Sequence, residues 1–273
     1  MPVRLLRTLM VIGIVAALAN PASADWQTLA PGLDLGTFPL ADVTPPAELT
    51  ALRVDPHLWD LDVFSATGSN LERGLNAKEW CEKLDLVAAI NAGMFDTDSR
   101  THIGYLRSAD HVNSAHRNSY QSVAAFQPKQ ADLPAFQIVD LDLPGASFDS
   151  LLARYDCLVQ NLRLIKRSRE NRWQPQPKAW SEAALGEDSQ GRALFLFCRT
   201  PFSMHDLNAQ LLAAALDLVC AQHLEGGPQA QLFVRAGKVE QEMVGSYQAD
   251  LRDTAVNETA WPIPNVIGVR RKP

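Results

Sequence analysis

The sequence His223-Leu224-Glu225-Gly226-Gly227-Pro228 lies between two apolar segments, and it organises the interpretation of the whole chain. Residues 218–223 and 230–235 are mostly apolar and predict two strands. The paired glycines allow positive φ angles and leave backbone N–H groups that can cradle a phosphate or a sugar oxygen. Glu225 would then be held at a strand end beside this cradle. The alternative is a hairpin turn with an ordinary exposed glutamate.

Two other predicted strands also end in polar side chains. Residues 86–90 lead into Asn91-Ala92-Gly93-Met94-Phe95, and residues 157–164 contain Gln160-Asn161-Leu162-Arg163. If these strand ends share one edge with Glu225, they form a polar pocket over a rigid sheet. The planar guanidinium of Arg163 suits a phosphate or a carboxylate, although a surface ion pair explains it equally well. Asparagine and glycine are also common in turns for backbone reasons alone.

Predicted strands outnumber predicted helices. Residues 58–64 alternate between apolar and polar side chains, as is typical of a half-buried strand. Further strands are predicted at residues 121–127, 135–141, 193–198 and 262–270, and helices at 76–84, 148–155 and 203–215. Because strands and helices do not alternate regularly, the pattern predicts a single α+β domain with a central mixed or antiparallel sheet flanked by helices.

The first 24 residues have the features of a signal peptide. Arg4 and Arg7 precede an apolar stretch, and Ala22-Ser23-Ala24 is a typical cleavage site. The apolar stretch is too short to span a bilayer, so we expect an exported protein, periplasmic or secreted, without a stable membrane anchor. Residues 25–48 are rich in turn formers and predict an N-terminal arm, which leaves residues 49–273 as the domain.

Charge and cysteine content exclude several classes of function. The chain has 25 Lys and Arg against 31 Asp and Glu, a net charge of −6, without a basic run. This balance disfavours nucleic acid and anionic membranes as partners. The cysteines are widely spaced, which excludes a zinc ribbon or a thioredoxin-like site but leaves both disulfides and buried free thiols open. They are Cys81, Cys157, Cys198 and Cys220. The spacing of histidines and acidic residues predicts neither metal nor cofactor, and the oligomeric state stays open.

Four segments, taken in order, resemble the boxes of the phosphodiester glycosidase domain family. Asn91-Ala92-Gly93-Met94-Phe95 resembles its Asn-Gly-Gly-Phe-Phe box, and Gln160-Asn161-Leu162-Arg163 its Asn-Ala-Gln strand. Ala183-Ala184-Leu185-Gly186 resembles its Arg-Thr-Ala-Ile-Gly segment, and Leu224-Glu225-Gly226-Gly227 its Leu-Asp-Gly-Gly-Gly-Ser-Ala box. No single box is specific. Together they cover nearly the whole expected domain and are most similar to a bacterial branch of the family.

The resemblance implies a hydrolase that cleaves a glycosidic bond to a phosphodiester-linked sugar, with a small-molecule or polymeric substrate. It implies that Glu225 is the base or nucleophile and that Glu182 is a second carboxylate, whose repulsion raises one of the two pKa values. The substrate-binding residues it implies are Asn91, Gly93, Phe95, Asn161, Arg163, Gly226 and Gly227. Glu182 could instead be a plain loop glutamate.

The chain also departs from the family pattern. Glu225 replaces an aspartate, Pro228 replaces a glycine, and Glu182-Ala183 stands where the family has Arg-Thr. A carboxylate therefore replaces an expected cation, and the activity of the family cannot be transferred unchanged. Two alternatives follow: a non-catalytic envelope protein that binds a glycan or a phosphate-sugar, and a structural envelope protein whose glycine boxes only shape turns.

Overall fold

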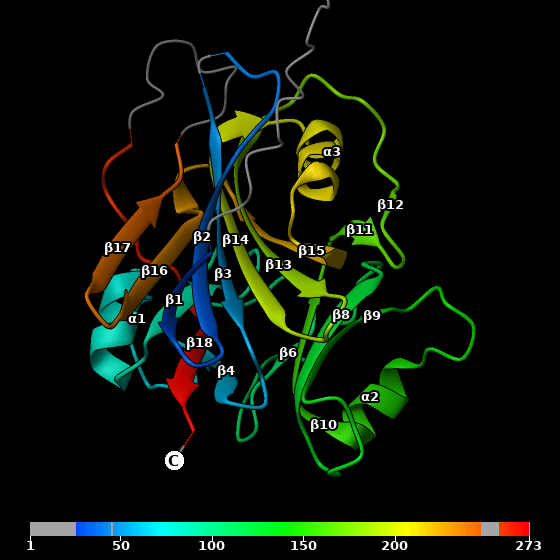
Figure 1. Ribbon diagram of the computed structural model, residues 1–273. Helices are drawn as coiled ribbons and strands as arrows, with labels where there is room; N and C mark the ends of the chain where they lie inside the picture. The colour runs from blue at the N-terminus through cyan, green and yellow to red at the C-terminus, as the bar shows by residue number, and fades with distance from the viewer. Residues whose placement is uncertain (1–25, 45, 247–256, 273) are drawn as a thin grey trace, which may run out of the picture.

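The computed structural model describes residues 26–44, 46–246 and 257–272, and the expected signal peptide at 1–24 lies outside these ranges. Within them the protein consists of three antiparallel sheets and three short α-helices (Figure 1). The largest sheet has eight strands in the order β1-β2-β3-β14-β13-β15-β11-β12. In that order they are Trp26–Ala30, Leu33–Pro39, Glu48–Val54, Ala193–Phe202, Trp180–Asp188, Leu218–Gly226, Arg163–Lys166 and Glu170–Asn171.

The two smaller sheets have five strands each. One has the order β7-β6-β10-β8-β9, which are Val112–Ser114, Leu106–Arg107, Tyr155–Asn161, Ser122–Pro128 and Phe136–Asp140. The other has the order β17-β16-β5-β18-β4, which are Val239–Val244, Gln231–Ala236, Ala88–Asn91, Asn265–Arg271 and Trp59–Ser65. The helices are α1 (Ala77–Leu84), α2 (Phe148–Arg154) and α3 (Met204–Ala213), with a 3-10 turn η1 at Gly227–Gln229.

One apolar core joins the three sheets. Leu52 of β3, Phe126 of β8 and Leu232 of β16 belong to the same buried cluster, although each comes from a different sheet. A second cluster covers the other face of the eight-stranded sheet, where Leu207 of α3 packs against Leu196 of β14. The sheets are therefore held together by apolar burial between layers, which is the dominant stabilising term in such packing.

The prediction of an α+β domain with one helix-flanked central sheet is wrong. Strands predominate, all the strand pairs within the sheets described are antiparallel, and three sheets replace the single one expected. The helices lie at the periphery, where they cap the ends and outer faces of the sheets (Figure 1). Period-2 alternation identifies a strand but not its partner, so short strands distributed over three sheets give the same pattern as one sheet.

The segment expected as an N-terminal arm contributes two strands to the largest sheet. β2 pairs with β3 from Leu33↔Val54 to Pro39↔Glu48 without interruption. The turn formers that suggested an arm form the tight connection between β1 and β2, where Gly32 has φ +72°. Trp26 packs edge-on against Phe38 with ring centroids 5.1 Å apart, which ties this hairpin to itself.

The predicted helix starts are confirmed. Asn76 accepts a hydrogen bond from the backbone N–H of Glu79, and the Glu79 carboxylate accepts one from the N–H of Asn76, which forms the expected capping box. Ser203 caps α3 by accepting a hydrogen bond from the backbone N–H of Asp206. None of the described helices has the length and apolar character that a membrane crossing requires.

The structure also shows whether the cysteines form disulfides. All four cysteines are buried and free. Burial raises the pKa of the Cys81 and Cys198 thiols to about 12, so both are neutral and unreactive.

Candidate active site

The three polar strand ends come from three different sheets, and they do not share one edge. Asn91 ends β5, Asn161 ends β10, and Glu225 is near the end of β15. The two asparagine side chains connect their strand ends to neighbouring segments of the backbone. Asn161 donates its Nδ2–H to the carbonyl of Ala92 at 2.8 Å, and Asn91 donates its Nδ2–H to the carbonyl of Gln229 at 2.9 Å.

The glycine pair is not a hairpin turn. β15 belongs to the eight-stranded sheet and β16 to a five-stranded sheet, so residues 227–230 carry the chain from one layer to the next. Gly227 has φ +65°, a conformation that favours glycine. The crossing is fixed by Asn91, whose Oδ1 accepts a hydrogen bond from the N–H of Gln231 at 2.7 Å. Asn91 therefore holds the crossing with both ends of its amide.

Replacement of Asn91 tests this bridging role. Asn91→Ala removes two buried hydrogen bonds and leaves a backbone N–H and a carbonyl without partners, so we expect a loss of about 2–4 kcal/mol in unfolding free energy. Asn91→Asp keeps the acceptor for Gln231 and should lose less. Urea denaturation of both variants measures the difference, and equal midpoints for Asn91→Ala and the parent would contradict the assignment.

Glu225 is buried beside a carboxylate–imidazole pair. The side chain of Glu225 is 7 % exposed, Glu182 is 1 % exposed and His223 is 5 % exposed. His223 Nδ1 lies 2.6 Å from Glu182 Oε1, and the indole N–H of Trp180 donates to Glu182 Oε2 at 2.9 Å. Glu182 is therefore not a loop glutamate, because it lies in β13 with both carboxylate oxygens hydrogen-bonded.

A register shift in the sheet sets the position of Glu225. Glu225 pairs with Ala183 and His223 pairs with Ala184, so Leu224 is an extra residue on β15. Such a bulge breaks the alternation of side chains and re-aims the residues next to it. Beyond the bulge, Gly226 donates its N–H to Glu225 Oε1 at 3.0 Å. This contact directs the Gly226 amide toward the protein's own carboxylate.

Burial controls the protonation of this cluster. Burial raises the pKa of Glu225 to about 7, and the Glu182 charge adds to this effect, while His223 and the Gly226 N–H partly oppose it. Burial alone would lower the pKa of His223, but the Glu182 carboxylate outweighs it and the pKa of His223 is raised. Burial also raises the pKa of Glu182, while His223 and the Trp180 indole N–H partly oppose this shift. Glu225 changes charge near neutral pH.

The indole ring of Trp180, which donates to Glu182, packs directly against Gly226. A Cβ at Gly226 would lie 2.5 Å from Trp180 Cδ1, so any side chain would displace the ring that donates to Glu182. The Trp180 and His223 rings pack edge to face with centroids 6.5 Å apart. His223 was not predicted from the sequence as a site residue, and Trp180 was considered only as an aromatic residue that could stack on a sugar ring or pack within the fold. One signal was present, because His223 lies two residues before Glu225 in a predicted strand.

Gly93 lies in a second buried cluster, with Asn161 and His102. A Cβ at Gly93 would lie 2.3 Å from both Asn161 Oδ1 and His102 Cε1. Asn161 Oδ1 is buried and has no hydrogen-bond partner among the described protein atoms, and the close packing of Gly93 covers it. Burial lowers the pKa of His102 to about 4, and this residue, which the sequence analysis did not select, is neutral. Phe95 borders the cluster through a β-bridge to His102.

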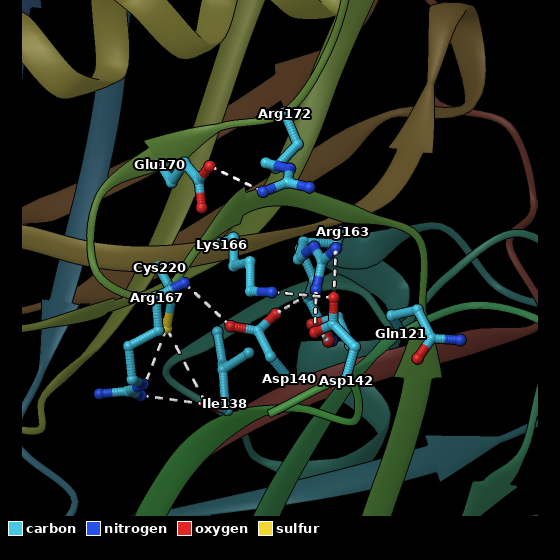
Figure 2. Close-up of polar contacts among 12 residues, drawn as sticks. Gln121, Ile138, Asp140, Asp142, Arg163, Lys166, Arg167, Glu170, Arg172 and Cys220 are labelled. Atoms are coloured by element: carbon cyan, nitrogen blue, oxygen red, sulfur yellow. Dashed lines mark hydrogen bonds and ion pairs between the residues drawn. The ribbon is translucent and has the colours of Figure 1, made fainter. Parts of the chain in front are cut away.

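Arg163 is engaged by carboxylates of the protein. Its Nη1 lies 2.7 Å from Asp142 Oδ1 and 3.1 Å from Asp140 Oδ1, and Lys166 also pairs with Asp142 at 2.9 Å (Figure 2). These cations lower the pKa of Asp142 to about 2. The charges that shift the pKa of Glu225 are those of His223 and Glu182, not that of Arg163. Arg163 therefore forms ion pairs with Asp140 and Asp142, as the alternative interpretation of this residue expected.

The structure thus defines a β-rich domain of three sheets, with a buried carboxyl–imidazole cluster on adjacent strands β13 and β15 of the largest one. The phosphodiester glycosidase family model matches residues 85–270, and the chain belongs to this family. The match includes the polar strand ends, the glycine crossing and both clusters.

Solved structures share the fold at low sequence identity. One is the catalytic domain of zebrafish N-acetylglucosamine-1-phosphodiester alpha-N-acetylglucosaminidase, auto-inhibited by its pro-peptide, with a TM-score of 0.63, 12% identity, and coverage of 91% of this chain and 88% of that one. Another is a hypothetical protein from Synechocystis, with a TM-score of 0.62, 14% identity, and coverage of 94% of this chain but 65% of that one. No curated protein gives a significant match in sequence.

Proposed function

We propose that this protein is a hydrolase of the phosphodiester glycosidase type, which cleaves the glycosidic bond between a sugar and a phosphodiester. The observation that carries the proposal is the Glu225 carboxyl, buried beside the Glu182–His223 pair with a pKa of about 7. A group with a pKa near the working pH is suited to general acid–base catalysis. Family membership and the zebrafish enzyme's phosphodiester chemistry support the substrate class.

In the proposed reaction, ionised Glu225 acts as a general base. It takes a proton from a water molecule whose oxygen attacks the anomeric carbon, while the bond from that carbon to the phosphate oxygen breaks. The electron pair leaves with the phosphate, which is a stable anion and needs little help from an acid. The protein must then stabilise a transition state with oxocarbenium character.

The Glu182–His223 pair has a supporting role in this proposal. The Glu182 charge raises the pKa of Glu225 and the His223 charge lowers it, so the two partners have opposite effects on its ionisation. The Trp180 indole fixes Glu182 by its N–H and covers Gly226.

Export belongs to the same proposal. It is supported by the charged start, the apolar stretch and the Ala22-Ser23-Ala24 site of the sequence. A protein exported to the periplasm or the medium would meet sugar phosphodiesters of surface polymers, so small-molecule and polymeric substrates both fit.

A non-catalytic glycan-binding protein is the alternative, and specific contacts favour it. The cation expected to hold phosphate is paired with Asp140 and Asp142, and the Gly226 amide is directed at Glu225. Both ends of the Asn91 side-chain amide are hydrogen-bonded to the backbone. A site that keeps its shape without a free cation could bind a sugar and not hydrolyse it.

The pH dependence of turnover separates the two functions. The purified protein is assayed with glycosyl phosphodiesters and para-nitrophenyl glycosides between pH 5 and 9. Because the base must be ionised and its pKa is about 7, we expect kcat/KM to fall about tenfold per unit below pH 7 and to level off above it. A profile that is flat from pH 5.5 to 8 argues against Glu225 as the base. Sugar binding without turnover at any pH supports the binding protein.

A further inference from the structure

A groove with a volume of about 420 Å³ adjoins the candidate active site. Tyr120 and Gln121 line it from the segment before β8, Leu162 and Arg163 from the start of β11, and Trp173 and Gln174 from the segment after β12. The backbone carbonyl of Leu162 accepts a hydrogen bond from the N–H of His223 at 2.8 Å. The groove and the carboxylate–imidazole pair therefore share a rigid backbone connection.

The aromatic residues of the groove are held in place before any ligand arrives. The Trp173 indole donates its N–H to the carbonyl of Arg163 at 2.8 Å, and the Trp173 backbone N–H is held by Asn171 Oδ1. The carbonyl of Tyr120 accepts from Gln160 Nε2 at 2.7 Å, and Gln160 is itself buried. Preorganised walls reduce the ordering cost of binding.

The charges around the groove cancel. Arg163 and Lys166 face Asp140 and Asp142, and Arg172 pairs with Glu170 at 2.8 Å. Figure 2 shows Gln121 near Arg163 and Asp142, and Arg172 next to Glu170. A phosphate would have to compete with carboxylates for these guanidinium groups. A neutral ligand with hydroxyl groups would instead meet planar polar side chains in fixed positions.

We propose that the groove bounded by Tyr120 and Trp173 is a subsite for a neutral sugar ring, in which the ring stacks on Trp173 and its hydroxyls bond to Gln121. The inference rests on the proposed function for its place in the reaction, because it assigns a sugar unit next to the cleaved bond. The hydrogen bond from the His223 N–H to the Leu162 carbonyl places this groove beside β15, two residues before Glu225.

Binding is measured without turnover, so that the two proposals can fail separately. The probes are neutral disaccharides of glucose, galactose, mannose and N-acetylglucosamine, and inorganic phosphate. They are titrated into the intact protein and followed by amide and indole NMR signals. We expect at least one disaccharide to shift the Trp173 indole signal, and Trp173→Ala to weaken its affinity at least about tenfold. Trp173→Phe should recover most of the affinity, and Trp26→Phe, remote from the groove, should change nothing.

Three results would overturn the subsite. They are no shift of the Trp173 signal with any disaccharide, equal affinity in Trp173→Ala, or a stronger response of the groove to inorganic phosphate than to the sugars. If the disaccharides bind as expected and no glycosyl phosphodiester is cleaved, the subsite stands and the hydrolase proposal fails. If cleavage proceeds and the Trp173 variants match the parent in sugar affinity, the hydrolase proposal stands alone.

Discussion

Replacing Glu225 with glutamine should abolish turnover and at the same time stabilise the protein at pH 8. Loss of a general base costs about 10²–10⁴ in rate. The fold should survive, because the amide oxygen of glutamine can still accept the Gly226 N–H that now bonds to Glu225 Oε1. Glu225→Asp keeps the charge, but its shorter side chain places the carboxylate farther from the reacting water. This variant should therefore retain partial activity. Full activity in Glu225→Gln would remove Glu225 from the mechanism.

The direction of the stability change follows from the pKa. The pKa of Glu225 is raised from 4.5 to about 7, so between these values the folded state holds a proton that the unfolded state releases. This contribution to stability is complete below pH 4.5 and is lost as pH rises through 7. Above pH 7 the buried charge costs about 3 kcal/mol relative to the neutral side chain. Glu225→Gln should therefore gain most of that amount at pH 8 and little at pH 4.5.

Glu187 provides a matched control for this experiment. It is also 7 % exposed, but it accepts a hydrogen bond from the N–H of Ile138 and pairs with Arg167. Glu187→Gln should lose about 1–3 kcal/mol, because it weakens a charged pair, and should leave turnover unchanged. Denaturation at pH 4.5 and pH 8, combined with initial rates, distinguishes the two carboxyls. A loss of stability in Glu225→Gln at pH 8 would contradict the assignment of a buried, poorly compensated charge.

The second large effect is expected at Gly93. In Gly93→Ala the new Cβ would lie 2.3 Å from Asn161 Oδ1 and from His102 Cε1, both buried and both held by hydrogen bonds to the backbone. The clash must move one of them, so we expect a loss of about 2–4 kcal/mol in stability. Turnover should also fall, because Asn161 links β10 to the residue after Asn91 in β5. Thermal unfolding and kcat/KM measure the two consequences.

A second glycine separates the clash from the backbone effect. Gly145 also has a positive φ, +82°, but a Cβ there would meet nothing within 4 Å. Gly145→Ala should therefore lose only the 1–2 kcal/mol expected for a left-handed residue and leave turnover unchanged. If Gly93→Ala is no less stable than Gly145→Ala, then Asn161 and His102 do not confine this position.

The helix starts and part of the strands were predicted from the sequence, because these depend on neighbouring residues, whereas β1, β2, β3, β13 and β17 were not predicted. The alternation of Trp59, Leu61 and Val63 identified β4, and Asn76 with Glu79 identified the start of α1. The sheet organisation could not be predicted in the same way. β1 and β2 lie in a segment whose turn formers suggested an arm, and only their pairing with β3 shows otherwise.

The candidate site was predictable in part. Glu225 and Glu182 were selected from the sequence, and they lie in one electrostatic cluster. The Glu182 charge raises the pKa of Glu225, and both carboxylates raise the pKa of His223. Arg163, also selected, is paired with Asp140 and Asp142, which are distant in sequence and become its partners only when β9 and β11 are brought together. His223 and His102 were overlooked because a lone histidine has no pattern until its environment is known.

The resemblance to the family, the excess of strands over helices and the residues at the polar strand ends can be recognised in short local segments of the sequence. Three facts appear only in the folded chain: those ends belong to three sheets, Leu224 is an extra residue in β15, and Glu225 is buried. Register, burial and charge pairing arise between segments far apart in the chain. They set the pKa of Glu225, and with it the chemistry that we propose.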